Sequence, residues 1–160
     1  MRYDSAMNGL SRLAGLLIVT ASTSLAQAEP KQVRTCDFEV KARCVSGTAS
    51  VTLTGNAVTG VEIIVHWCGR DTYGFTCTID SSRGDGESQW SDEGGTTVIA
   101  NSSPFNPAEP DRVKVTIGKH VSIDLEEAQS VGRCGAGAEL PRAIVIPAGR
   151  KTCRVWLRPP

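Results

Sequence analysis

The sequence predicts an all-β domain, and its simplest form is an antiparallel β-sandwich held together by disulfides, with a small β-barrel as the alternative. Three observations support this prediction. Apolar and polar residues alternate with a period of two over many short segments, and turn residues separate those segments. In addition, all six cysteines follow an N-terminal segment of the kind that directs secretion.

Residues 1–28 are expected to be a cleavable signal peptide. Arg2 and Arg12 make a weakly basic start, and residues 13–25 form an apolar run that is too short to span a bilayer comfortably. The motif AQA, with small residues at its first and third positions, then predicts cleavage after Ala28. The mature protein is therefore expected in the periplasm or the extracellular space.

The mature chain, residues 29–160, has a length that fits one domain. The full sequence has 17 basic and 17 acidic residues, and loss of Arg2, Arg12 and Asp4 leaves 15 and 16, a net charge of −1. A nearly neutral chain is not expected to bind nucleic acid. No later apolar run is long enough to predict a membrane span.

About nine short strands are predicted along the mature chain. Residues 36–44 alternate between apolar and polar, and residues 48–54 repeat the pattern. Residues 61–67 are apolar on both faces, which is typical of a central strand. The one helical pattern, at residues 125–129, is short. The other predicted strands are 75–79, 96–100, 112–117, 121–125, 143–146 and 151–157.

An even number of cysteines behind a signal peptide predicts three structural disulfides in an oxidising compartment. The cysteines are Cys36, Cys44, Cys68, Cys77, Cys134 and Cys153. If residues 36–44 form one continuous strand, its end cysteines lie about 26 Å apart. A disulfide needs Cα atoms within about 7 Å, so Cys36 and Cys44 are not expected to pair with each other.

The favoured pair is Cys68 with Cys77. These two cysteines flank a predicted hairpin turn, and we expect them to lie opposite each other across that hairpin. The two N-terminal cysteines would then reach Cys134 and Cys153 in either order.

The mature sequence offers little catalytic chemistry. It has two histidines, His66 and His120, and it lacks the H-x-H, H-E-x-x-H and C-x-x-C motifs of zinc enzymes and thiol oxidoreductases. Glu62 shares a strand face with His66 and could orient it as the base of a hydrolase. The alternative is a half-buried strand histidine with a hydrogen-bond partner. We expect no enzyme activity and no cofactor.

Residues 79–90 contain the triplet Arg83-Gly84-Asp85, and this segment is predicted to be a mobile surface loop. A cell-adhesion role and calcium binding are the alternatives. The EF-hand pattern fails, because aligning Gly86 with its glycine puts Ser81 and Arg83 at two carboxylate positions. A calcium site of another type would use carboxylates from Asp80, Asp85, Glu87, Asp92 and Glu93.

The last predicted strand places Arg154, Trp156 and Arg158 on one face. Arginine next to tryptophan is typical of the residues that contribute most to binding at interfaces. The alternative is that Trp156 packs in the core and the arginines are solvated.

Two further aromatic residues are candidate contacts for a partner. Phe105 lies near the middle of the proline-rich segment 101–111, and Trp90 lies beside the acidic segment. The expected function is a secreted or periplasmic binding or inhibitory module with a protein or glycan partner. The alternatives are a structural envelope or surface protein without a discrete ligand, and a hydrolase centred on His66.

Overall fold

Two antiparallel sheets stack face to face in this protein, as the sequence predicted for a sandwich. A computed structural model describes residues 29–68, 74–101, 111–128, 134 and 140–159. The four-stranded sheet has the order β1-β2-β3-β4, formed by Lys31–Val40 (β1), Val45–Thr54 (β2), Ala57–Trp67 (β3) and Phe75–Ser82 (β4). The six-stranded sheet has the order β10-β9-β8-β7-β6-β5, formed by Ser88–Glu93 (β5), Thr96–Asn101 (β6), Asp111–Ile117 (β7), Val121–Asp124 (β8), Ala143–Ile146 (β9) and Arg154–Trp156 (β10).

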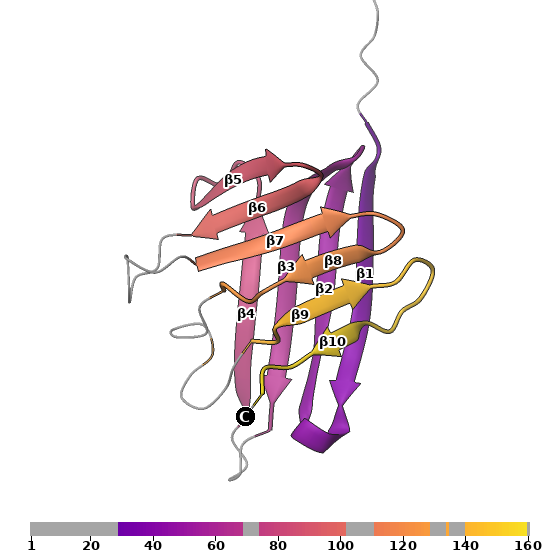
Figure 1. Cartoon of the computed structure of the whole chain (residues 1–160), viewed down its shortest axis with the longest axis vertical. Coiled ribbons are helices and arrows are strands. Elements are labelled where there is room, and N and C mark those ends of the chain that lie inside the picture. The colour runs from indigo at the N-terminus through magenta and orange to yellow at the C-terminus, as the bar shows by residue number, and fades with distance from the viewer. Residues whose placement is uncertain (1–28, 69–73, 102–110, 129–133, 135–139, 160) are drawn as a thin grey trace, which may run out of the picture.

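The strands of the six-stranded sheet run across those of the four-stranded sheet (Figure 1). Alternation of side chains explains how each strand contributes to the core. In β2, for example, Val51 and Leu53 are buried between the sheets, whereas Thr52 and Thr54 face outward and are half-buried. The strand that is apolar on both faces, β3, lies between β2 and β4, so its predicted central position is confirmed.

The core is aliphatic and receives side chains from both sheets. Ile63 and Ile79 from the four-stranded sheet, and Ile99, Ile123 and Ile144 from the six-stranded sheet, are almost completely buried. Burial of such side chains is the main source of stability in a domain of this size. The core therefore holds both sheets rigidly enough to present their outer faces to solvent.

Three disulfides form, and two of them connect the two layers. Cys36 of β1 bonds to Cys153, next to β10, and Cys77 of β4 bonds to Cys134, between β8 and β9. All four of these cysteines are buried. Cys36 does not bond to Cys44, the next cysteine in the sequence, so this prediction is confirmed.

The favoured pairing of Cys68 with Cys77 is wrong. The predicted hairpin does form, but its register pairs Trp67 with Phe75 and Val65 with Cys77. Cys77 therefore lies inside the ladder with its side chain in the core, whereas Cys68 lies beyond the end of β3 and is exposed. Cys68 bonds to Cys44, because the register of β2 and β3 brings the residues next to Val45 and Trp67 together.

The predicted strand 36–44 is also corrected. β1 ends at Val40, a short 3-10 helix follows at Lys41–Arg43, and Cys44 has a left-handed φ of 51°. The chain thus turns before Cys44, which lies on the return path into β2. This turn is why Cys44 reaches the exposed end of the hairpin and not the interior.

Residues 79–90 are not a continuous loop, which corrects a second prediction. Residues up to Ser82 belong to β4, and β5 begins at Ser88, so ten strands are described where about nine were expected. The helical pattern at 125–129 does not yield a helix in its described residues, where Glu126 and Glu127 form a turn. In the described part of the chain, no helix is long and apolar enough to cross a membrane.

Candidate binding surface

Trp156 and Arg154 project from the outer face of the six-stranded sheet. The register of β10 and β9 places Trp156 beside Ala143 and Arg154 beside Val145, and both of these neighbours are half-buried. The side chain of Trp156 is 50% exposed. The alternative that placed this indole in the core is therefore wrong, and the ring lies on the outer face of β10, the edge strand of its sheet.

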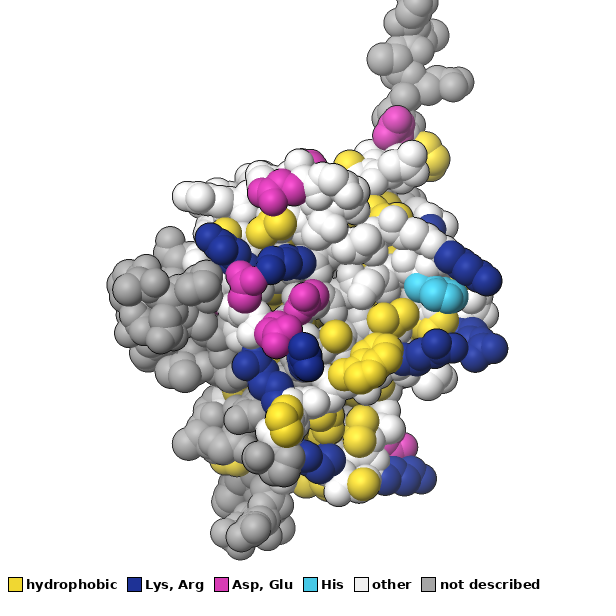
Figure 2. Space-filling model, in the orientation of Figure 1, with side chains coloured by type: hydrophobic (Ala, Val, Ile, Leu, Met, Phe, Trp, Pro, Cys, Tyr) yellow, Lys and Arg dark blue, Asp and Glu magenta, His cyan; other side chains and the backbone are white. Residues whose placement is uncertain are grey.

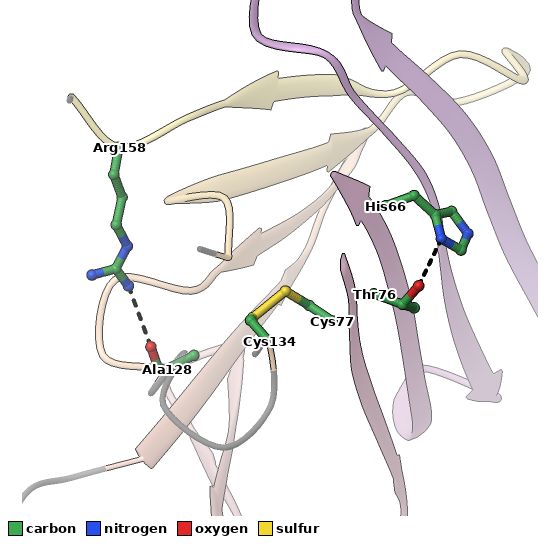
Figure 3. Close-up of a disulfide and its surroundings, with 6 residues drawn as sticks. All are labelled: His66, Thr76, Cys77, Ala128, Cys134 and Arg158. Atoms are coloured by element: carbon green, nitrogen blue, oxygen red, sulfur yellow. Dashed lines mark hydrogen bonds between the residues drawn. A yellow bond between two sulfur atoms is a disulfide. The ribbon is translucent and has the colours of Figure 1, made fainter. Parts of the chain in front are cut away.

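Arg158 does not share this face. β10 ends at Trp156, and the Arg158 guanidinium turns toward the segment after β8 (Figure 3). Its Nη2 donates hydrogen bonds to the backbone oxygens of Leu125, Glu126 and Ala128, at 2.8, 3.1 and 3.3 Å. The arginine fastens the C-terminal segment, so it is not available to a partner.

Unpaired cations lie beyond Arg154 along the same side of the molecule. Lys119 is in the β7–β8 turn, and Arg150 and Lys151 are in the β9–β10 loop. A hydrogen bond from the Ala148 amide to a ring nitrogen of the histidine beside Lys119 links the two loops at 3.2 Å. None of these three cations, nor Arg154, has a carboxylate partner among the described residues.

On the other side of Trp156 lies Arg142, whose charge is balanced by a carboxylate. Its backbone amide donates to the Trp156 oxygen at 2.8 Å, and its guanidinium pairs with Glu126 at 3.2 Å. Hydrophobic side chains gather over β9 and β10, with lysines and arginines on both sides of them (Figure 2). We call the group formed by Trp156, Arg154, Ala143, Val145, Arg142, Arg150, Lys151 and Lys119 the Trp156 face.

The neighbouring part of the same sheet is electrically balanced. Lys114 on β7 pairs with Glu127, which also accepts from Arg112 at 3.5 Å. The hydrogen bond between Lys114 and Glu127 raises the pKa of the ammonium and lowers the pKa of the carboxyl. Both groups therefore stay charged and neutralise each other. Among the described residues of this sheet and its loops, the cations without an ion-pair partner lie around β10.

The Arg83-Gly84-Asp85 triplet forms a tight turn between the two sheets. The Asp85 carboxylate accepts hydrogen bonds from the backbone amides of Ser82, Glu87 and Ser88, and the bond from Ser82 contributes most to lowering its pKa. The backbone amide of Arg83 donates to the Thr59 oxygen at 2.9 Å. The segment is therefore a turn held by its own side chains.

The side chain of Arg83 is used within the molecule. It pairs with Asp92 at 2.8 Å and stacks on Trp90, 5.3 Å from the ring centre. The hydroxyl of Thr97 donates to Asp92 at 2.7 Å, and this bond and that from Arg83 lower the pKa of Asp92. Both charged residues of the triplet therefore have hydrogen-bond partners within the molecule. Trp90 is half-buried on the inner face of β5, so it supports the turn.

The calcium candidates are not gathered into a site. Two of them are engaged in the turn: Asp85 accepts hydrogen bonds from backbone amides, and Asp92 forms an ion pair with Arg83. Asp80 lies on the outer face of β4. Glu87 is exposed in the turn itself. Among the described residues there is no group of three or more histidine, cysteine or acidic side chains that could hold a metal ion.

His66 and Glu62 have separate partners. The Nδ1 atom of His66 lies 3.1 Å from the hydroxyl of Thr76 (Figure 3), and Ser50 donates to Glu62 at 3.4 Å. Four residues along one strand span roughly 13 Å, which is too far for the carboxylate to orient the imidazole. His66 lines a shallow groove of about 360 Å³ together with Trp67 and the disulfide at the end of β2 and β3.

The outer face of the four-stranded sheet was not singled out in the sequence. It carries a row of hydroxyls along β2, namely Ser46, Thr48, Ser50, Thr52 and Thr54. Its carboxylates are Asp37, Glu39, Glu62 and Asp80. These serines and threonines occur at every second position in the sequence. Hydroxyl side chains are common on the outer faces of strands, however, so the pattern alone did not indicate a partner.

The remaining predicted contact, Phe105, lies outside the described residues. The chain was compared with protein-family models, curated proteins and solved structures, and none of them matches. The function is therefore argued from the surfaces themselves. Within the described residues, the Trp156 face places the most exposed aromatic ring, Trp156 at 50%, beside cations that have no ion-pair partner.

Proposed function

We propose that the mature chain is a non-catalytic binding module of the periplasm or the extracellular space, and that it binds its partner through the Trp156 face. The observation that carries this proposal is the half-exposed Trp156 beside an unpaired Arg154 on one strand. Tryptophan and arginine are the residues most enriched among those that dominate binding energies.

The backbone beneath this face supports the proposal. Arg154 follows Cys153 directly, and the disulfide to Cys36 ties this point to the other sheet. Hydrogen bonds also run from the Cys153 amide to the Asp37 oxygen, at 2.8 Å, and from the Asp37 amide to the Lys151 oxygen, at 2.7 Å. A strand held in this way loses little conformational entropy on binding, which favours affinity.

The secreted location is supported by the disulfides. Three bonds in a chain of this size are typical of proteins that fold in an oxidising compartment. The predicted signal peptide at residues 1–28 is part of the same proposal.

The test is affinity capture from envelope and secreted material with the oxidised mature protein. Trp156→Ala and the matched variant Phe75→Ala, which removes an exposed aromatic ring from the other sheet, are compared with the wild type. We expect one species to be retained in a fixed ratio by the wild type and by Phe75→Ala, and to be lost with Trp156→Ala. Equal retention by all three proteins, or recovery of the protein itself alone, would overturn the proposal and favour a structural role.

The hydrolase alternative has its own control. His66→Ala removes the imidazole but leaves the Trp156 face unchanged. We expect this variant to retain the captured species as the wild type does, because binding does not involve the groove beside β3. A hydrolytic activity of the wild type that disappears in a folded His66→Ala protein would replace the binding proposal.

A further inference from the structure

We infer that the ligand of the Trp156 face is an acidic polysaccharide whose sugar units carry carboxylates. This inference rests on the proposed function, since it names the class of molecule that the same face would bind. Three properties of the face support it: its exposed indole ring, its cations without acidic partners, and the placement of those cations in one direction from the ring.

The exposed indole suits a sugar ring. Trp156 lies on the outer sheet face opposite Ala143, and the next outward residue of β9, Val145, lies opposite Arg154. Trp156 does not line the groove beside His66 or the groove beside Asp92. A pyranose presents a flat face of C–H groups that stacks on an exposed indole without needing a pocket, whereas an apolar peptide side chain is best anchored in one.

The charges suit carboxylates. Lys119, Arg150, Lys151 and Arg154 are exposed and have no acidic partner among the described residues. An arginine presents parallel N–H donors that match the two oxygens of a carboxylate, and such charge-assisted bonds are stronger than neutral ones. These cations are left uncompensated in a mature chain whose overall net charge is −1. A negatively charged ligand would supply the missing counter-charges.

The cations extend in one direction from the ring. Arg154 lies two residues from Trp156 on the same face of β10, which is about 7 Å along a strand. The loop carrying Arg150 and Lys151 continues from that strand, and the bond between Ala148 and His120 keeps the turn with Lys119 next to it. A linear polymer with an acid group on each unit can stack one ring on Trp156 and pair its following units with these cations.

An acidic peptide fits the face less well. It would satisfy the cations, but it offers no ring for Trp156 unless an aromatic residue is placed there. A second copy of this chain is the other candidate occupant, since the four-stranded sheet carries the carboxylates Asp37, Glu39 and Asp80. The exposed ring of that sheet, Phe75, has the strand parity of the buried Cys77, whereas the Asp80 carboxylate lies on the opposite face of β4. Ring and carboxylates are therefore not combined on one face there, as a partner for both Trp156 and the cations would require.

The test measures binding of the mature protein to oligogalacturonate by calorimetry at low and moderate salt. Two matched probes separate ring from charge: the methyl ester keeps the rings but removes the charges, and poly-L-glutamate keeps the charges but has no rings. We expect oligogalacturonate, or the equivalent oligomer of mannuronate, to bind, and the ester and the polypeptide to bind at least tenfold more weakly.

Two variants and their controls locate the site. Trp156→Ala should weaken binding about tenfold or more, as does loss of a dominant interface residue. Arg154→Gln should weaken it by roughly three- to tenfold and reduce its salt dependence. Phe75→Ala and Arg43→Gln, matched substitutions at exposed sites of the four-stranded side, should have no effect.

Each other result overturns the inference. Equal binding of poly-L-glutamate would mean that the face recognises charge alone, as an acidic protein segment would provide. Self-association that is lost with Arg154→Gln would identify a second copy of the chain as the occupant. Failure of all acidic oligosaccharides, combined with Trp156-dependent capture of a protein, would refute this inference but leave the proposed function standing.

Discussion

The disulfides that join the two sheets differ from the one that lies within a single sheet. Cys36–Cys153 and Cys77–Cys134 pass through the buried region between the layers, with all four cysteines 8% exposed or less. The third disulfide closes the end of the β2–β3 hairpin, and both of its cysteines are exposed.

This difference indicates what each bond does. A bond between layers holds together parts of the chain that are far apart in sequence, 117 and 57 residues, whereas the hairpin bond spans 24. Cross-links that close longer loops restrict the unfolded chain more strongly. The bonds between layers should therefore contribute most to the free energy of unfolding. The hairpin bond, which is exposed, should be the first to be reduced.

The largest effect is expected from removing the bond that closes the longest loop. Replacing Cys36 and Cys153 together with alanine should lower the free energy of unfolding by about 5 kcal/mol, because this bond joins cysteines 117 residues apart in sequence. Urea denaturation followed by far-UV circular dichroism measures this loss. A loss below that of the hairpin variant would show that loop length does not govern these disulfides.

The second bond between layers should rank next. Replacing Cys77 and Cys134 together with alanine should cost about 4 kcal/mol, since the loop is 57 residues long. The same denaturation experiment gives the value. Because both cysteines are completely buried, the double alanine substitution leaves no unpaired polar group in the core.

The hairpin bond should be the weakest of the three and the first to be reduced. Replacing Cys44 and Cys68 with alanine should cost about 3 kcal/mol. In the wild type, mild reductant followed by alkylation and mass spectrometry should label these two cysteines before any other, because thiol exchange requires access to the sulfur. Simultaneous labelling of all six would mean that reduction proceeds through global unfolding.

The smallest effect is expected at the turn after β4, where the chain passes from one sheet to the other and hydrogen bonds, not a disulfide, hold the backbone. The pKa values of Asp85 and Asp92 are lower in the folded protein than their ordinary value of 3.8. The stability from these carboxylates is thus present above pH 3.8 and is lost as the pH falls through the lower folded-state pKa.

Asp85→Asn should therefore reduce stability slightly at neutral pH and make it less sensitive to pH below about 4. Thermal melting between pH 2 and pH 7 measures both effects. Asp80→Asn is the matched control, because the Asp80 carboxylate has no hydrogen-bond partner in the described part of the chain. Identical acid profiles for the two variants would exclude a role for the hydrogen bonds of the turn.

Local patterns were sufficient for the strands but not for the cysteine pairing. Cys68 and Cys77 do flank a hairpin, yet a shift of register decides which residues face each other and which face the core. The strand β5 was not predicted for a different reason. It lies at the edge of its sheet and is largely exposed, so its sequence shows no alternation of apolar and polar residues.

The candidate site was predicted in part. Trp156 and Arg154 were recognised because they alternate on one strand, whereas Arg158 was included wrongly because the strand ends before it. Lys119 and Arg150 were missed, since the turns that carry them are about 30 residues apart in sequence. They come together only because β8 pairs with β9.

The sequence by itself determined that this chain is a disulfide-stabilised β protein, because side-chain alternation and an even set of cysteines are local properties. It also determined which residue types were available for chemistry. The tertiary structure alone decided which cysteines pair, whether Trp156 is buried, and which cations surround it. Those outcomes depend on strand order and register, which are set by the packing of distant residues around one core.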